Sequence, residues 1–348
     1  MKRLDTQIRV YKMSNYFERY PISQQPAPNV ILFGEIKKCK VAYIVTTYKR
    51  LDMLIRCIQS LSCQKCKYDY QIIINDNDIE TIDFYHKNKQ RYQDLTQIKN
   101  VVYSVNLHNI GGHNNLNQGA FIAQADFICF VHDDDVVHPK HLTEMIRVIE
   151  NNPDQYYIGT GLYVLDTLKD SSCIQTYLES APLKINEVTS VSFKQLYKNY
   201  VNPMLGAIIK RDKFIELGGL GADCCIEDYI FTCRFTKDCG SALCNSRLYG
   251  YVIQDNDSLK ASVCEKVICE KYKLRQAINK KEKLFSRPKN WLLNHIYLAR
   301  DIAYYESKKN TAHVKISRKV IKKELNVNLF ILRIGVVFAK LVRLINNK

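Results

Sequence analysis

The sequence predicts an α/β protein with a mostly parallel sheet, followed by a basic helical appendage. Three observations lead to this class. Apolar segments of strand length alternate with segments of helical periodicity, polar residues follow several of the strand-like segments, and the excess positive charge lies at one end of the chain. The 348 residues fit one large α/β domain with an appendage or two modest domains, and a hydrophobic fraction of 46% allows a sizeable core.

Three regions are predicted along the chain. Residues 1–35 are polar and contain prolines, so we expect an N-terminal extension there. Residues 36–258 hold the alternating strand-like and helical segments and form the expected α/β domain. Residues 259–348 form the expected basic helical C-terminal region.

The alternation begins at Val41. The β-branched run VAYIVTT predicts a buried parallel strand, and the following LDMLIRCIQSL has apolar residues at helical spacing. The next predicted strands are QIIIN, VVYSV and DFICFVH, with IDFYHKNKQRYQDLTQ and NNLNQGAFIAQ as helices among them. After Pro139, HLTEMIRVIE is a predicted helix, and YYIGTGLYVL, VNPMLGAII and LYGYVIQ are strand-like. Such alternation implies right-handed βαβ units.

Polar residues follow three of the predicted strands at their carboxyl ends. They are Thr46–Tyr48 after the first strand, Asn75–Asp78 after the second and His132–Asp135 after the fourth. Because ligands of such sheets bind outside the carboxyl ends of the strands, we expect these residues to converge on one crevice. No GxGxxG segment follows the first strand, which disfavours a dinucleotide cofactor held by a glycine-rich turn.

The clearest chemical feature is the acidic triplet Asp133-Asp134-Asp135. Adjacent carboxylates repel one another unless a cation lies among them. Mg²⁺ and Mn²⁺ favour carboxylate and phosphate oxygens, and neighbouring residues in an extended turn point different ways, so one or two of the three would bind the ion directly. In the alternative interpretation, one Asp caps the following helix and the others are solvated. The triplet alone leaves both interpretations open.

Four segments in order resemble the family 2 glycosyltransferases. They are VAYIVTTYKRLDMLIRCIQSLSCQ, IIINDND, NIGGHNNLNQGAFIAQADFICFVHDDDVVHP and GGLGADCCIEDYIFTCRF. The resemblance covers roughly residues 40–256. It implies the GT-A fold, a Rossmann-like, mostly parallel sheet flanked by helices, and a transferase that moves a sugar from a nucleotide-diphosphate donor with inversion.

The resemblance assigns donor-binding roles to individual residues. Thr46, Tyr48 and Asp76 match positions that hold the base and ribose of the nucleotide. Asp134 and Asp135 match the acidic element that binds the ribose and the metal on the diphosphate.

The resemblance also implies a Mg²⁺ or Mn²⁺ cofactor. Asp135 is the first choice of ligand, because it matches the final Asp of the acidic element, and Asp133 is a provisional one. Family members often place a further His ligand after the last strand, where this chain has Gln254. His132 stands at the first position of the acidic element, where Asp is common.

Asp228, in the pair Glu227-Asp228, matches the catalytic base of the family, and Arg234 matches a basic residue of the same segment. Cleavage of the donor builds positive charge on the sugar and negative charge on the departing diphosphate. A carboxylate on the opposite face removes the proton of the attacking acceptor hydroxyl, and a single displacement inverts the anomeric centre. The alternative for Glu227 and Asp228 is a pair of helix N-terminal carboxylates that complement the macrodipole.

The basic residues are concentrated in the tail. Lys260–Lys348 holds 22 Lys and Arg against 6 Asp and Glu, so the rest of the chain, with 29 of each, is formally neutral and the net charge of +16 lies in the tail. In LFILRIGVVFAKLVRLI, the basic residues Arg333, Lys340 and Arg343 fall in one narrow helical sector and the rest is apolar. This pattern predicts a helix in the headgroup layer of an anionic membrane. The alternative is a helix packed on the catalytic domain, and no motif indicates nucleic acid.

The location is predicted to be cytoplasmic, at the inner face of the cell membrane. Thirteen cysteines lack a second pair at metal-binding spacing, and the N-terminus has no apolar signal segment, so the thiols are expected to be reduced. A glycan or lipid-linked acceptor in bacterial surface polysaccharide or lipopolysaccharide synthesis fits such a place. The alternatives are a degenerate membrane-associated binding module and a sugar nucleotidyltransferase.

Overall fold

The computed structural model describes residues 27–64, 66–167, 170, 172–180, 188–221, 224–253, 260–307 and 316–346. These residues form two compact units. The larger unit holds the described residues of Arg19–Ala222 and Phe231–Asn256, and the smaller holds those of Asp223–Ile230 and Asp257–Lys348.

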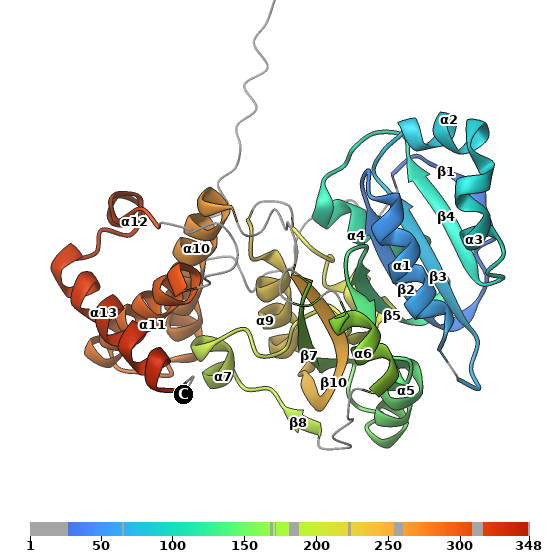
Figure 1. Ribbon diagram of the computed structural model, residues 1–348. Coiled ribbons are helices and arrows are strands. Elements are labelled where there is room, and N and C mark those ends of the chain that lie inside the picture. Colours follow the sequence, from blue (N-terminus) through green and yellow to red (C-terminus); the bar gives the residue numbers. More distant parts are fainter. Residues whose placement is uncertain are drawn as a thin grey trace, which may run out of the picture. The chain divides into compact units, whose positions relative to one another are not determined.

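The larger unit is an α/β sheet with helices on both faces (Figure 1). The strands are β1 (Asn29–Phe33), β2 (Cys39–Thr47), β3 (Tyr70–Asp76), β4 (Val101–Asn106), β5 (Ala125–His132), β6 (Val136–Val137), β7 (Tyr157–Asp166), β8 (Val188–Ser190), β9 (Ile208–Lys210) and β10 (Ala242–Ile253). The helices of this part of the chain are α1 (Leu51–Ser62), α2 (Glu80–Lys87), α3 (Gln93–Thr96), α4 (Gly112–Ile122), α5 (His141–Asn151), α6 (Cys173–Ser180), α7 (Phe193–Lys198), α8 (Arg211–Glu216) and α9 (Glu227–Cys239).

The strand order is β1-β4-β3-β2-β5-β9-β7-β10-β6, and β8 pairs with β10. The strands β4, β3, β2 and β5 are parallel to one another, as are β7 and β10. β9 is antiparallel to both β5 and β7 and joins the two parallel sets. The predicted fold class, a mostly parallel sheet flanked by helices, is confirmed.

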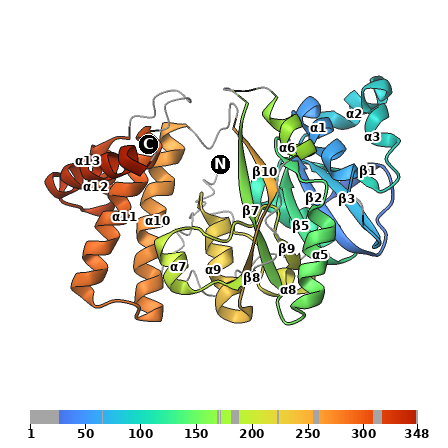
Figure 2. The ribbon, with the colours of Figure 1, turned by 60° about the horizontal axis from the view of Figure 1, so that its bottom comes forward.

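β2 lies at the centre of this sheet and contributes to the core on both faces. Val41, Tyr43 and Val45 pack in one cluster with residues of α1 and α5, while Ile44 belongs to the other cluster, with residues of α4, α8 and α9. Figure 2 shows the strands of this sheet with helices beside them. α4 lies so close to β2 that a Cβ atom at Gly119 would be 2.2 Å from the Ile44 side chain. Successive side chains of β2 thus alternate between the two clusters, as expected of a strand that is buried on both faces.

Two segments differ from the expectation. Residues 29–33, assigned to the N-terminal extension, form the edge strand β1, which pairs antiparallel with β4. Residues 82–97, expected to form one helix, contain α2, a 3₁₀ helix (Lys89–Tyr92) and α3. The break comes at Asn88, whose φ of −132° and ψ of 41° end α2.

The smaller unit contains the predicted basic C-terminal helices. They are α10 (Ala261–Glu282), α11 (Arg287–Ser307), α12 (Arg318–Leu325) and α13 (Leu329–Asn346). Their shared core includes Ile268, Leu298 and Leu332. Arg275 and Asp301 form a buried ion pair within it. Of the helices in the described ranges, none combines the length and the apolar character needed to cross a bilayer.

Candidate metal and donor site

The polar ends of β2, β3 and β5 lie beside one another, because the strands are parallel and in register. Thr46 pairs with Asn75 of β3 and with His132 of β5, and Thr47 pairs with Asp76. The register of the strands therefore brings these residues together at one edge of the sheet, as the sequence predicted.

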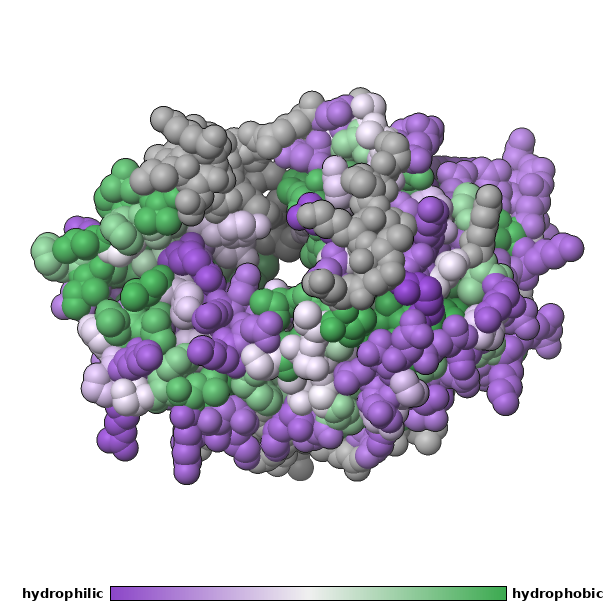
Figure 3. Space-filling view, turned by 90° about the horizontal axis from the view of Figure 1, so that it is seen from below, coloured by the Kyte–Doolittle hydropathy of each residue, from purple (hydrophilic) through white to green (hydrophobic). Residues whose placement is uncertain are grey.

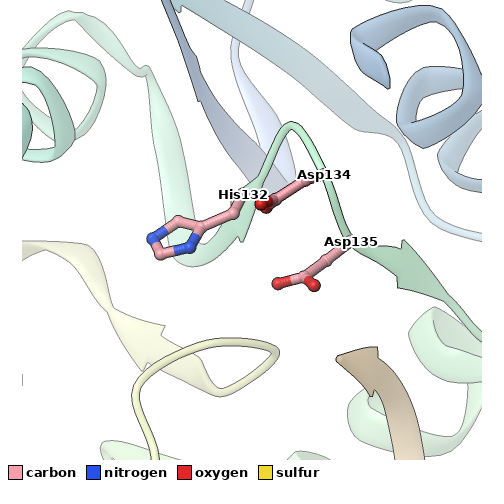
Figure 4. Close-up of side chains that lie close together, drawn as sticks. All are labelled: His132, Asp134 and Asp135. Atoms are coloured by element: carbon pink, nitrogen blue, oxygen red, sulfur yellow. The ribbon is translucent and has the colours of Figure 1, made fainter. Parts of the chain in front are cut away.

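A possible metal-binding group is formed by His132, Asp134 and Asp135. One ligand atom from each side chain, an imidazole nitrogen or a carboxylate oxygen, lies within 4.8 Å of the others. The three residues come from the end of β5 and the turn before β6, and Figure 4 shows the ring and both carboxylates facing a common space. Two buried carboxylates and an imidazole form a donor set that suits a divalent cation, so these residues fit the predicted cofactor.

Asp135 is fixed on both oxygens. The Tyr249 hydroxyl donates to Oδ2 (2.6 Å), and the backbone N–H of Val252 donates to Oδ1 (2.8 Å). The same hydroxyl accepts from the backbone N–H of His132 (3.2 Å). Burial raises the pKa of Asp135 to about 7, since ionisation without a nearby cation is unfavourable in this position. Tyr249 and Val252 of β10 therefore orient a carboxylate that a cation would stabilise.

Asp133 points elsewhere and is not a member of this group. Its Oδ2 accepts from the Thr47 hydroxyl (2.7 Å), and its Oδ1 lies 3.5 Å from the Arg50 guanidinium. Arg50 lies equally near Oδ2 of Asp134. The structure thus brings two of the three triplet carboxylates together with His132, and directs the third toward β2 and the start of α1.

A cavity of about 440 Å³ lies beside these strand ends. Its lining includes Asp76 and Thr47, together with Arg50, Tyr92 and Tyr103. The other three predicted donor residues, Thr46, Tyr48 and Asp134, are not among the described residues that line this cavity.

Asp76 is buried at the wall of this cavity. Its Oδ2 accepts from the hydroxyls of Thr81 and Tyr103, each at 2.8 Å, and its Oδ1 accepts from the backbone N–H of Asp78 (2.9 Å). Burial nevertheless raises the pKa of Asp76 to about 6. Asp76 thus holds the side chains of Tyr103 and Thr81, which also line the cavity, in place.

The Asp76→Asn variant is expected to remove one pH-dependent part of the stability. With an ordinary pKa of 3.8 and a folded-state pKa of about 6, the unfolded chain releases this proton first as the pH rises. Raising the pH from 4 to 7 therefore lowers the free energy of unfolding by about 2 kcal/mol through this residue alone. Urea unfolding across this range measures it, with Asp126→Asn on β5 as the control. The prediction is wrong if the Asp76→Asn and wild-type curves fall in parallel.

Glu227 and Asp228 begin α9, within the part of that helix that belongs to the smaller unit. Glu227 is buried and accepts from the Cys224 thiol (3.5 Å), whereas Oδ1 of Asp228 accepts from the backbone N–H of Tyr229 (2.8 Å). The two neighbouring carboxylates therefore have different surroundings. Arg234, further along α9, is buried and donates to the backbone carbonyl of Gly219 (2.7 Å).

Two residues of the site were not among the candidates from the sequence. His132 was noted as a departure from the family pattern, and nothing local in the sequence marks Tyr249 as a partner of Asp135, 114 residues away. Gln254, the third predicted ligand, lies outside the described residues.

Comparison with known proteins places the chain among related sequences. Residues 43–216, half of the chain, match the profile described as Glycosyl transferase family 2. Two relatives are uncharacterized glycosyltransferases, one of Methanocaldococcus jannaschii with 24% identity over 191 residues and one of Haemophilus influenzae with 25% identity over 205 residues. The alignments cover 53% and 57% of this chain, and the chain spans 62% of the length of each relative.

Two solved structures are similar at 12% identity. A mannosyltransferase of Pyrobaculum calidifontis in complex with GDP-Man and Mn²⁺ has a TM-score of 0.49, over 95% of this chain and 86% of that chain. TarS of S. aureus in complex with UDP-GlcNAc has a TM-score of 0.47, over 86% of this chain and 89% of that chain. Similarity at this level concerns the fold alone.

Proposed function

The chain belongs to glycosyl transferase family 2 and has the GT-A fold, and from this premise we propose a metal-dependent, inverting sugar transfer. The donor is a nucleotide-diphosphate sugar, and the acceptor is a glycan or a lipid-linked sugar. The observation that carries the proposal is the His132, Asp134 and Asp135 group at the carboxyl end of β5, beside a cavity of about 440 Å³.

The residues at the strand ends have different roles in donor binding. Asp76, held by Tyr103, forms the cavity wall that receives the base and ribose. Thr46, near the end of β2, and Tyr48, directly after it, lie outside the cavity lining and are proposed to contact the donor from the neighbouring strand end. Asp134 and Asp135 would hold Mg²⁺ or Mn²⁺, which would supply positive charge to the departing diphosphate. The side-chain interactions of Asp133 with Thr47 and Arg50 give it a supporting part in this arrangement.

Asp228 is the proposed catalytic base. It accepts the proton of the acceptor hydroxyl while that oxygen attacks the anomeric carbon, and the bond to the diphosphate breaks in the same displacement. The new linkage therefore has the opposite anomeric configuration to the donor. Glu227, turned toward the Cys224 thiol, supports the start of α9 rather than the proton transfer.

A donor panel tests the function. The full-length protein is incubated with uridine, guanosine and thymidine diphosphate sugars and Mn²⁺, with and without a membrane extract, and nucleotide release is measured. We expect one donor class to be turned over faster with the extract, and NMR of the product to show an inverted anomer. Asp126→Asn, on the same strand as the metal group, is the matched control. Release from no donor, or a retained anomer, contradicts the proposal.

The C-terminal helix supports a membrane-bound acceptor. One face of α13 is apolar and exposed, and its residues are Phe330 (72%), Ile334 (56%), Val337 (60%), Phe338 (67%) and Leu341 (53%). The opposite face carries Leu332 and Val336, which are buried in the core of the smaller unit. Figure 3 shows apolar side chains gathered over the helices of this unit. An apolar face on a tail with 22 basic and 6 acidic residues suits an anionic bilayer surface, at the cytoplasmic side of the membrane.

Replacing both Phe330 and Phe338 by Ser is expected to weaken binding to anionic vesicles by about a hundredfold, because each exposed Phe ring inserts apolar area into the bilayer. Flotation with vesicles of phosphatidylcholine and phosphatidylglycerol measures the change. Val164→Ser removes an exposed apolar side chain (56%) from β7 and serves as the control. Unchanged flotation of the double variant, or a wild-type protein that dimerises and ignores vesicles, contradicts the membrane role.

A further inference from the structure

His132 belongs to the candidate metal group, but the proposed function assigns the cation only to Asp134 and Asp135 and gives the His132 ring no role. It is the last residue of β5, and its backbone is held on both sides. The N–H donates to the Tyr249 hydroxyl (3.2 Å), and the carbonyl accepts from the Cys57 thiol (3.4 Å). These contacts hold the backbone of His132 but not its side chain. The ring lies beside the carboxylates of Asp134 and Asp135.

The His132 ring is placed as a metal ligand would be. One ring nitrogen lies within 4.8 Å of a carboxylate oxygen of Asp134 and of Asp135, so small side-chain rotations would bring the three atoms to the distances that one ion requires. The ring and both carboxylates are turned toward one space (Figure 4). Over the residues that the structure describes, the imidazole accepts no hydrogen bond and donates none. Imidazole is a common metal ligand, and this half-buried ring stands beside two buried carboxylates, one of which, Asp134, also lies 3.5 Å from Arg50.

The other triplet carboxylate does not compete for this place. Asp133 accepts from the Thr47 hydroxyl at 2.7 Å and is 3.5 Å from Arg50, and both contacts draw it toward β2 and α1. Of the two residues that flank Asp134 on its N-terminal side, His132 therefore lies in the group with Asp134 and Asp135, and Asp133 does not.

We propose that His132 binds the divalent cation directly through nitrogen, and that this ligand makes the site prefer transition-metal ions to Mg²⁺. The inference rests on the proposed function, in which a cation binds at Asp134 and Asp135. Mg²⁺ takes oxygen ligands and gives up its water reluctantly. Imidazole nitrogen suits first-row transition metals, whose affinities for a mixed nitrogen and oxygen site rise from Mn²⁺ to Co²⁺. The affinity of the site is therefore expected to rise from Mg²⁺ through Mn²⁺ to Co²⁺.

Pulsed electron paramagnetic resonance on the full-length protein with Mn²⁺ tests the ligand itself. A coordinated imidazole gives ¹⁴N modulation of the Mn²⁺ signal, which an oxygen ligand, including the amide oxygen of Gln254, does not give. We expect this modulation in the wild type, its loss in His132→Asp with Mn²⁺ still bound, and its retention in His108→Asp, a surface control. Bound Mn²⁺ without ¹⁴N modulation in the wild type, or with modulation that survives in His132→Asp, overturns the inference.

Calorimetric titration with Mg²⁺, Mn²⁺ and Co²⁺ tests the selectivity. His132→Asp converts the site to oxygen ligands, so the ratio of Co²⁺ to Mg²⁺ affinity is expected to fall by about tenfold or more, and an unchanged ratio overturns the selectivity. Failure of the wild type to bind any of these ions overturns this inference together with the metal requirement. The donor panel then shows separately whether sugar transfer proceeds, so the two failures are distinguishable.

Discussion

Asp135→Asn is expected to lower kcat/KM for the preferred donor by about a thousandfold, which corresponds to roughly 4 kcal/mol of transition-state stabilisation. The loss follows from position and charge. Asp135 is fully buried, both its oxygens are oriented by Tyr249 and Val252, and it lies in the group that fits the cation. Asn preserves the shape and the acceptor for the Val252 N–H but removes the charge. Initial rates with Mn²⁺ and a donor series, together with Mn²⁺ binding by electron paramagnetic resonance, measure the effect.

Two further variants make this result specific. Tyr249→Phe keeps Asp135 but removes the hydroxyl that orients it, so Mn²⁺ affinity is expected to fall by about 10- to 100-fold, less than the loss in Asp135→Asn. Asp126→Asn removes a carboxylate near the opposite end of β5, where it pairs with Lys40, and is expected to leave the rate unchanged. Equal rates for Asp135→Asn and Asp126→Asn, with both proteins folded by circular dichroism, would refute a metal role for Asp135.

The fold was predictable where the pattern of apolar side chains marks a strand or a helix. β2 and β5 are apolar runs that alternate between two cores, and the helices that cover them have their own period, so the sheet followed from the order of these segments. The match over residues 43–216 confirms the family resemblance and includes the first three of the four segments almost completely, whereas the fourth, with Glu227 and Asp228, lies beyond it. β1 was missed although its sequence NVILF is apolar, because it follows a polar segment with prolines and was assigned with that segment to one extension. Its pairing partner β4 lies more than 60 residues further along the chain, so nothing nearby in the sequence marks it as an edge strand.

The site was predictable in part, for a reason that its geometry makes clear. The sequence shows which residues follow β5, but the direction of each side chain depends on the turn that leads to β6. That turn groups Asp134 and Asp135 with His132, while Asp133 points to Thr47. Tyr249 could not be recognised, because it reaches Asp135 only after the chain has returned through β10. Long-range contacts of this kind leave no local pattern.

Asp228→Asn is expected to lower kcat by about 10²- to 10⁴-fold while the affinity for the donor stays within a factor of two, because the base acts on the acceptor proton and not on the nucleotide. Steady-state kinetics with a saturating donor, and donor binding by calorimetry, separate the two quantities. Glu227→Gln is the matched variant at the neighbouring position. The Glu227 carboxylate accepts from the Cys224 thiol. Glu227→Gln is therefore expected to lower kcat less than Asp228→Asn does, through reduced stability of the protein and not through loss of a base.

The two carboxylates Asp135 and Asp228 are therefore distinguishable by the step that each affects. Loss of the metal ligand weakens donor binding and slows bond cleavage, whereas loss of the base leaves a donor complex that forms normally and does not react. If Asp228→Asn weakens donor binding as strongly as Asp135→Asn does, Asp228 belongs to the donor site. The base is then another group, and the first turn of α9 is explained by its carboxylates complementing the helix dipole.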